Sequence, residues 1–249
     1  MARLFIQFAN QSASADAAPV SSFPFCMGVW FRKSGGSSPE TLLFFGDKDT
    51  FADAYTRLLI TKLGKVQADS AHTANVVTTT GVFDDNQWHS CLLAESDTGG
   101  FRQLDLYVDG TLIGTDNSSN PGGLSIFGRV AFGRAMGPTP FDSLQGTLAE
   151  GFLADVAPSA AQVAAWSRGI SARSVFGTSI QGYWPLWGLH SPEIDVSTKG
   201  NDLTLVGTSR DTHATVASYT PKWAATQPAI AATGFRRISI DGVVSELPV

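Results

Sequence analysis

Apolar and polar residues alternate along several stretches of this chain. In residues 23–31 every odd position is apolar, so an extended segment would carry one continuous apolar face. Successive side chains of a β-strand point to opposite faces of a sheet, and this pattern therefore predicts a core strand of a sheet with one buried face. Residues 104–108 repeat the alternation and run into Asp109-Gly110, a dipeptide that favours a tight hairpin turn before a return strand at 111–113.

Other short runs predict further strands and an all-β fold. These runs are residues 3–8, 41–45, 57–61, 87–94, 125–132, 148–154, 182–186 and 203–206. Clusters of Gly, Asn, Asp, Ser and Pro separate them, as expected for turns. Short strands joined in this way favour an antiparallel β-sandwich of the jelly-roll kind over alternating strand and helix units.

One short helix interrupts the strands. Ser159 can cap its first turn, and Gln162 stands at the position that completes a capping box. Gly169 can supply the left-handed residue that ends it.

The composition changes near Pro221, where the chain becomes rich in Ala, Thr and Pro. Residues 235–249 then predict a short hairpin around Asp241-Gly242. We therefore predict a jelly-roll β-sandwich in residues 1–220 and a C-terminal extension or arm in residues 221–249.

The overall composition narrows the class of protein. Charged residues make up 16% of the 249, below the roughly 25% of average soluble proteins, while apolar residues make up 43%. A disordered chain has the reverse balance, so most of this chain should fold. The net charge of −5 argues against nucleic-acid binding through counterion release. No apolar stretch reaches the roughly 20 residues of a membrane span, so we expect no membrane partner.

Two further features bear on the cellular compartment. The first ten residues lack the unbroken apolar stretch of a secretory signal peptide, so we expect synthesis in a cytosol. Cys26 and Cys91 lie within predicted strands and are expected to be two buried thiols.

One segment suggests an enzyme. Glu193 and Asp195 resemble the opening of the Glu-x-Asp-x-(x)-Glu signature of laminarinase-like retaining glycosidases. Retaining hydrolysis needs two carboxylates about 5–5.5 Å apart. Ser197 and Thr198 stand where the second carboxylate is required. We therefore predict a structural loop here.

Other catalytic arrangements have less support. A Ser-His-Asp hydrolase is disfavoured because Gly-x-Ser-x-Gly is absent and the four histidines are scattered, at His72, His89, His190 and His213. We expect His89, at the start of a strand, to pack or to hydrogen-bond the backbone. Neither cysteine has a partner at zinc-binding spacing, so no zinc site is predicted.

Two loops could bind a ligand. Asp47, Asp49 and Asp53 could present oxygen atoms to a calcium ion, although acidic loops between strands are usually solvated turns. Residues 183–187 form the most aromatic stretch, which could stack on sugar rings. Alternation divides that stretch between two faces, and at least one set is expected to be core.

Four segments resemble the laminin-G-like, concanavalin-A-like jelly-roll superfamily. In order along residues 25–31, 86–93, 106–110 and 146–152 they read FCMGVWF, NQWHSCLL, LYVDG and GTLAEGF. They are similar to the family's apolar strand with a Trp-aromatic pair, its Trp-His strand, its hairpin and the strand before its short helix. The resemblance implies the jelly-roll fold. It places none of the family's calcium ligands on this sequence.

Residues 166–172, 182–186 and 191–195 look like stand-alone versions of this fold that tailed phages and prophages encode. That resemblance implies a virion component made in the host bacterial cytoplasm. The first hypothesis is a non-enzymatic capsid decoration protein, with the major capsid protein as partner and a homo-oligomer on the virion. The alternative is a tail-associated glycan-binding module that contacts the host surface. The third hypothesis is a polysaccharide-cleaving enzyme.

The C-terminal extension carries the candidates for partner binding. Phe235, Arg237, Ile238 and Ile240 lie in an alternating segment that could add a strand to the sheet edge of a neighbouring protein. The other possibility is that the extension folds back on its own sandwich. Apart from the possible calcium ion, we predict no cofactor.

Overall fold

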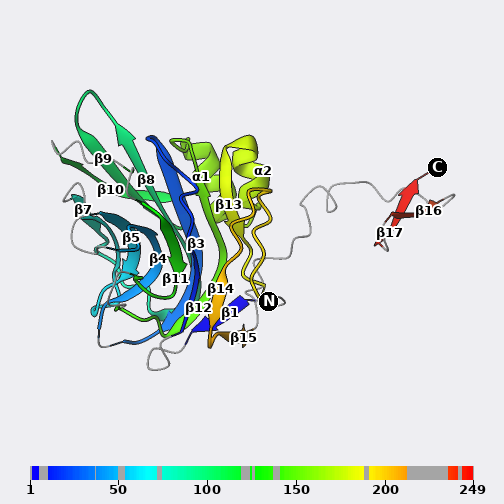
Figure 1. Ribbon diagram of the computed structural model, residues 1–249, viewed down its shortest axis with the longest axis horizontal. Helices are drawn as coiled ribbons and strands as arrows, with labels where there is room; N and C mark the ends of the chain where they lie inside the picture. The colour runs from blue at the N-terminus through cyan, green and yellow to red at the C-terminus, as the bar shows by residue number, and fades with distance from the viewer. Residues whose placement is uncertain are drawn as a thin grey trace. The chain divides into compact units, whose positions relative to one another are not determined.

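The computed structural model describes most of the chain (Figure 1). Its contacts fall into two units. The described residues are 2–5, 11–36, 38–49, 54–71, 75–118, 124, 127–136, 141–187, 191–211, 235–240 and 243–248. The first unit spans residues 1–216 and the second spans residues 217–249.

Two antiparallel sheets form the first unit. The larger sheet has the order β10-β9-β8-β3-β12-β1-β15, and β13 also pairs with β12. Its strands are β1 (Ala2–Phe5), β3 (Phe25–Ser34), β8 (Asp85–Asp97), β9 (Arg102–Val108), β10 (Thr111–Ser118), β12 (Gly146–Ala154), β13 (Ile180–Trp184) and β15 (Ser209–Asp211).

The second sheet has seven strands in the order β14-β2-β11-β4-β5-β6-β7. Its strands are β2 (Ser12–Ala15), β4 (Glu40–Gly46), β5 (Tyr55–Ile60), β6 (Val66–Ser70), β7 (Asn75–Thr78), β11 (Arg129–Phe132) and β14 (Thr204–Val206). The two sheets pack face to face, so the predicted all-β antiparallel sandwich is confirmed (Figure 1).

The main core lies between the two sheets. From β3 it receives Phe25, Met27, Val29 and Phe31, which are all fully buried. These are odd-numbered positions of the alternating segment, and their predicted role as a core face is confirmed. Apolar side chains from the second sheet meet them, and Phe45 of β4 makes an edge contact with Phe25 at a ring-centroid distance of 6.0 Å.

A second core lies between the outer face of the larger sheet and two helices, α1 (Ala160–Ser167) and α2 (Ala172–Phe176). The short 3-10 helix η2 (Gly177–Ser179) follows α2 directly. Cys26 and Trp30 of β3 are buried there, so the expectation that this strand has one buried face is wrong. The helices explain the difference, because they cover the face that would otherwise meet water. A Cβ atom on Gly28 would lie 2.6 Å from Phe152 and 2.9 Å from Trp166, so glycine permits this close packing.

The start of α1 has the predicted capping box. Ser159 Oγ accepts a hydrogen bond from the Gln162 backbone N–H, and the Gln162 side chain accepts one from the Ser159 N–H at 2.9 Å. Gly169 follows the helix with a φ of 88°, which is the left-handed conformation expected at its end. No helix among the described residues is long and apolar enough to cross a membrane.

One side of the sandwich is closed by side chains that join β7 to β9 and β10. Asn75 Nδ2 donates to the Arg102 carbonyl at 2.8 Å, and Asp116 Oδ2 accepts from the Val76 N–H at 2.8 Å. The Asp116 carboxylate thus satisfies a backbone donor of β7, which is an edge strand. On the other side, β14 and β15 are edge strands of the two sheets, and the chain passes between them through Gly207, which has a φ of 69°.

The second unit contains an antiparallel hairpin of β16 (Phe235–Ile240) and β17 (Val243–Pro248). Ile240 pairs with Val243, so the predicted hairpin is confirmed in its backbone, while the predicted turn residues themselves lie outside the described part. The candidates Phe235, Arg237, Ile238 and Ile240 all lie on β16. Their side chains are outside the described structure, and their role in partner binding stays a prediction.

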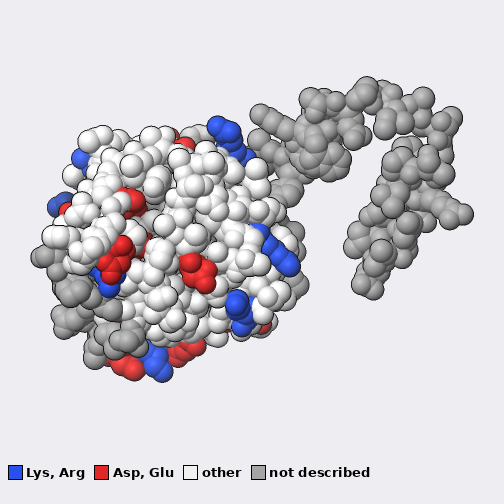
Figure 2. All heavy atoms as spheres, turned by 90° about the horizontal axis from the view of Figure 1, so that it is seen from above, with Lys and Arg blue, Asp and Glu red and all other residues white. Residues whose placement is uncertain are grey.

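Charged side chains are sparse on the sandwich. Figure 2 shows acidic and basic residues scattered over a mostly uncharged surface on the face in view. This agrees with the 16% of charged residues in the chain. The few groups in which charges meet are therefore informative.

Candidate functional site

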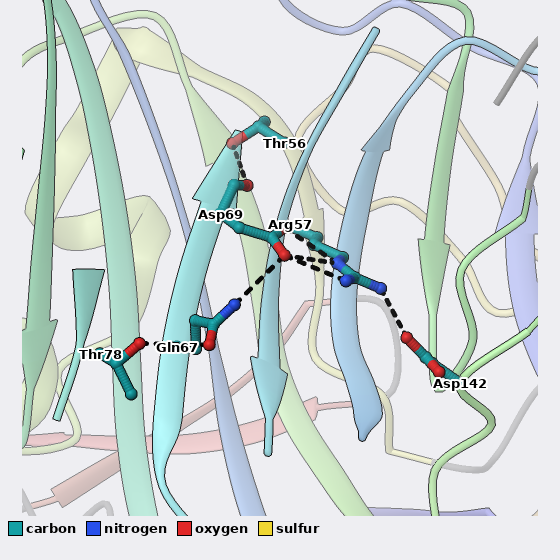
Figure 3. A network of polar contacts seen from close by, with 6 residues as sticks. All are labelled: Thr56, Arg57, Gln67, Asp69, Thr78 and Asp142. Atoms are coloured by element: carbon teal, nitrogen blue, oxygen red, sulfur yellow. Dashed lines mark hydrogen bonds and ion pairs between the residues drawn. The ribbon is translucent and has the colours of Figure 1, made fainter. Parts of the chain in front are cut away.

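The outer face of the seven-stranded sheet carries an arginine held between two carboxylates. Leu58 and Ile60 of β5 point into the main core, so Arg57 points to the opposite face. The register places Asp69 of β6 directly opposite Arg57. Asp142 approaches from the segment before β12, and Figure 3 shows the guanidinium between the two acids.

The guanidinium uses all three of its nitrogens in these contacts. Arg57 Nε lies 2.9 Å from Asp69 Oδ1, and Nη2 lies 3.0 Å from Asp69 Oδ2, so this pair is bidentate. Arg57 Nη1 donates to Asp142 Oδ2 at 2.7 Å. Side chains of Arg57 and Asp69 are about nine-tenths buried, at 10% and 11% exposure, and the cluster is therefore rigidly placed.

Two aromatic rings enclose the same guanidinium. Its central carbon lies 5.3 Å from the ring centroid of Tyr55 and 5.4 Å from that of Phe141, within the range of cation–π contacts. Phe44 stacks on Tyr55 at 5.9 Å and is fully buried on this outer face. The rings of Tyr55 and Phe141 are themselves half-buried.

The electrostatics of the cluster follow from its composition. Burial alone would lower the pKa of Arg57, but the hydrogen bonds and charge of Asp69 raise it above its ordinary value, so the arginine stays charged. The pKa of Tyr55 is raised by burial and then by the nearby carboxylates of Asp69 and Asp142, while Arg57 opposes this shift.

A row of polar side chains extends the cluster across β6 and β7. Gln67 Nε2 donates a long hydrogen bond of 3.4 Å to Asp69 Oδ2, and the Thr78 hydroxyl donates to Gln67 Oε1 at 3.1 Å (Figure 3). The row ends at the exposed Thr78. We call residues Tyr55, Arg57, Gln67, Asp69, Thr78, Phe141 and Asp142 the Arg57 face.

Asp142, at the opposite end of the Arg57 face from Thr78, is held in place by a backbone hydrogen bond. Thr41 N–H donates to the Asp142 carbonyl at 2.7 Å, and Asp142 has a φ of 52°. Its side chain is 20% exposed. While Oδ2 binds Arg57, Oδ1 accepts no hydrogen bond from any other described residue. Asp142 therefore presents an open acceptor at the surface.

The calcium candidates lie elsewhere. Asp47 follows β4 and is buried, and its Oδ1 accepts from the Asp49 N–H at 2.9 Å, which closes a turn. Asp53 lies outside the described residues. Within the part of the chain that the structure describes, no three His, Cys, Asp or Glu side chains are grouped to hold a metal ion. The calcium site stays a prediction.

Glu193 and Asp195 have structural roles, as predicted. Glu193 is buried and its Oε2 lies 2.8 Å from Arg3 Nη2 of β1. Asp195 accepts backbone hydrogen bonds from Tyr183 at 3.0 Å, Ser197 at 2.8 Å and Asn201 at 3.0 Å. These contacts fix the loop after β13.

His89 packs as predicted but has different hydrogen-bond partners. Its ring contacts Phe31 and Phe83, at 5.7 Å and 5.0 Å between centroids. Its Nδ1 lies 2.7 Å from Asp109 Oδ2 and its Nε2 lies 3.1 Å from Asp85 Oδ1. The predicted packing is therefore confirmed, and the ring nitrogens bind carboxylates rather than the backbone, because the Asp109-Gly110 turn brings Asp109 to the ring. The other three histidines lie outside the described residues.

The aromatic stretch after Ile180 mostly packs, as predicted. Trp184 and Leu186 are fully buried in the main core, and Tyr183 is buried under the helices. Trp187 is 42% exposed. Both cysteines are free and buried, as predicted: Cys91 lies in the main core and Cys26 in the second.

The Arg57 face was not among the residues that the sequence singled out. A charged residue at the start of the apolar segment 57–61 is a signal that could have drawn attention to it. Its partners are 12 and 85 residues away, however, so only the fold brings them together.

Comparisons with known proteins agree with this architecture. A model of the concanavalin A-like lectin/glucanases superfamily matches residues 8–164, a range that contains the whole Arg57 face. No curated protein matches the chain. The CBM40 module of the Ruminococcus gnavus IT-sialidase, solved with α2,3-sialyllactose, has a TM-score of 0.55 at 15% identity, over 66% of this chain and 96% of that one.

Two other solved structures are similar. A Bacteroides ovatus protein provisionally described as carbohydrate binding has a TM-score of 0.63 at 17% identity, over 85% of this chain and 60% of its own length. Domains LG4-5 of the mouse laminin α1 chain have a TM-score of 0.50 at 14% identity, over 62% of this chain and 42% of that one. At such identities these likenesses show the fold alone. The match to the superfamily covers more than half of the sequence, and the chain belongs to the concanavalin A-like lectin/glucanases superfamily.

Proposed function

We propose that this chain is a non-enzymatic glycan-binding module and that the Arg57 face is its binding surface. The observation that carries this proposal is the row of polar groups from Thr78 to Asp142 beside two half-buried aromatic rings. A saccharide has hydroxyl groups that need hydrogen-bond partners and apolar C–H faces that pack on aromatic rings. Both needs can be met at one place here.

The rigidity of the face supports binding. The bidentate pair of Arg57 and Asp69 joins adjacent strands, and the second contact of the arginine ties Asp142 to them. A surface that is already ordered loses little conformational entropy when a ligand arrives. Similarity of fold to carbohydrate-binding modules agrees with this proposal.

The same contacts argue against glycoside hydrolysis at this face. A retaining or inverting glycosidase needs two carboxylates on opposite sides of the scissile bond, with open space between them. Between Asp69 and Asp142 the guanidinium of Arg57 occupies that space. Asp69 and Asp142 therefore cannot act as the two carboxylates of a glycosidase.

A glycan array probed with the full chain tests the proposal. We expect saturable binding to at least one glycan and a clear loss of affinity in Phe141→Ala, which removes one ring of the face. Phe101→Ala is the matched control, because Phe101 is 52% exposed in the β8–β9 turn. Equal loss in both variants, or binding that Phe141→Ala leaves intact, would contradict the assignment of the site.

We retain capsid decoration as a second proposal, with the virion as location and the major capsid protein as partner. It is motivated by the C-terminal hairpin, which forms a contact unit of its own. A glycan-binding module could also be carried on a virion. The test is binding to purified capsids with and without residues 224–249, and unchanged binding of the shorter chain would remove the role of the arm.

A further inference from the structure

We infer that the Arg57 face selects neutral saccharides and excludes glycans that carry a carboxylate, an inference that rests on the proposed function. The first support is the state of the arginine. All three guanidinium nitrogens of Arg57 already donate to Asp69 or Asp142. An acidic sugar would have to displace one of these contacts to reach it.

A neighbouring arginine is also engaged. Arg129 of β11 donates from Nε to Asp16 Oδ1 at 2.7 Å and from Nη1 to the Met136 carbonyl at 3.4 Å. Recognition of a ligand carboxylate relies on a charged donor that can form a fork with it. Arg57 on this face and Arg129 beside it are instead bound to carboxylates of the chain itself.

The open groups of the face suit hydroxyl donors. Asp142 Oδ1 accepts no hydrogen bond from another described residue, and the hydroxyl oxygen of the exposed Thr78 can accept one as well. A sugar hydroxyl can donate to either oxygen, whereas an ionised carboxylate can only accept. A ligand carboxylate would also be repelled by Asp69 and Asp142, which outnumber the single arginine between them.

The test is an array on which each neutral oligosaccharide is printed beside its sialylated counterpart. The full chain is compared with Asp142→Asn and with Thr78→Val, an exposed position where substitution should not disturb folding. Asp105→Asn is the control, since the Asp105 carboxylate accepts hydrogen bonds from Gln103 and Thr115 and lies on the other sheet. Thermal unfolding of every variant shows whether it is folded.

We expect neutral members to bind at least about tenfold more tightly than their sialylated counterparts. Asp142→Asn should weaken neutral binding by about tenfold, because hydrogen bonds to charged acceptors are among the strongest. Thr78→Val should weaken it by a smaller factor, and Asp105→Asn should leave it unchanged.

Two results would overturn the inference in distinguishable ways. Tighter binding of sialylated members, reduced by Phe141→Ala, would leave the glycan-binding face in place and refute its preference for neutral sugars. Absence of binding to every saccharide at millimolar concentration would refute the proposed function and the inference together. Binding of neutral sugars that Asp142→Asn and Thr78→Val both leave unchanged would move the ligand to another surface.

Discussion

Among single residues, Arg57 contributes to both the stability of the second sheet and the candidate site. Its replacement by alanine would leave the carboxylate of Asp69 nine-tenths buried without its partner. Breaking a buried ion pair in this way costs about 3–5 kcal/mol. We therefore expect Arg57→Ala to lower the free energy of unfolding by about 3 kcal/mol in urea titrations.

Arg129→Ala provides the comparison. Arg129 contacts one carboxylate rather than two, and the side chain that carries it, Asp16, is 55% exposed. Exposed pairs contribute about 0–1 kcal/mol, so the loss should stay below 1 kcal/mol. Similar losses in the two variants would mean that the Arg57 cluster does not behave as a buried network.

His89 should make stability depend on pH. Burial lowers the pKa of His89, but the hydrogen bonds and charges of Asp109 and Asp85 raise it by more. The resulting pKa lies above the ordinary value of 6.5. A group whose pKa is raised by folding stabilises the folded state below its unfolded pKa, and this contribution is lost as pH rises through the folded pKa.

We therefore expect the melting temperature of the wild type to fall between pH 6 and pH 8. His89→Gln should remove part of that decrease, because it has no titrating ring. The shifted carboxyl groups start from much lower values: the pKa values of Glu40 and Glu150 are raised from 4.5, and those of Asp16 and Asp85 are lowered from 3.8. An identical pH dependence in both proteins would contradict this assignment.

At the scale of elements, β3 is the strand on which both cores depend. Gly28 faces the helices, where an added Cβ would lie 2.6 Å from Phe152 and 2.9 Å from Trp166. Gly28→Ala should therefore destabilise by about 1–3 kcal/mol, the usual effect of overpacking.

Gly81→Ala is the control for that substitution. The nearest atoms to its Cβ belong to Phe83 at 3.5 Å, which is ordinary contact, and no positive φ is required there. We expect its free energy of unfolding to stay within about 0.5 kcal/mol of wild type in the same denaturant titration. If Gly28→Ala were equally mild, the helix layer would have to be more loosely packed than the structure shows.

The elements that the sequence predicted are those with a strong local signal. In residues 23–31 apolar and polar positions alternate over a full strand, and residues 104–113 contain an alternating strand followed by the Asp-Gly turn. The capping box of α1 likewise involves only neighbouring residues. By contrast β6, β7 and β2 were not predicted, because they are short and rich in polar or small residues. Their strand conformation depends on pairing with neighbours rather than on their own pattern.

The candidate site was beyond prediction for a related reason. Asp142 lies 85 residues from Arg57, and its carboxylate reaches the arginine because backbone hydrogen bonds hold the segment before β12 to Thr41 of β4 and to the residues after β11. The sequence also directed the search for sugar-stacking rings to residues 183–187, where aromatic residues are most frequent, although these residues mostly fill the cores. The rings of the site, Tyr55 and Phe141, stand alone in the sequence.

At the scale of the whole molecule, the two contact units should be separable. Contacts divide the chain at residues 216 and 217, and both edges of the sandwich are formed by residues of the first unit. A chain of residues 1–216 should therefore unfold cooperatively with nearly the wild-type melting temperature. The melting temperatures of the two chains should differ by less than roughly 2–4 °C, the shift that a change of 1 kcal/mol in the free energy of unfolding causes in a domain of this size.

Scanning calorimetry of both chains measures this directly. A fall of 10 °C or more, well above the roughly 2–4 °C just estimated, would indicate that the C-terminal residues stabilise the sandwich. The same short chain, applied to the glycan array, would also show whether glycan binding needs the hairpin.

The two buried thiols give this molecule a native pair of probes for its own opening. Cys26 is enclosed under the helices and Cys91 between the sheets, and burial raises the pKa of both. Neither can react with an alkylating reagent until its own layer comes apart. Pulsed alkylation followed by peptide mass spectrometry would therefore time the loss of the helix layer and the separation of the sheets independently, in the unmodified protein.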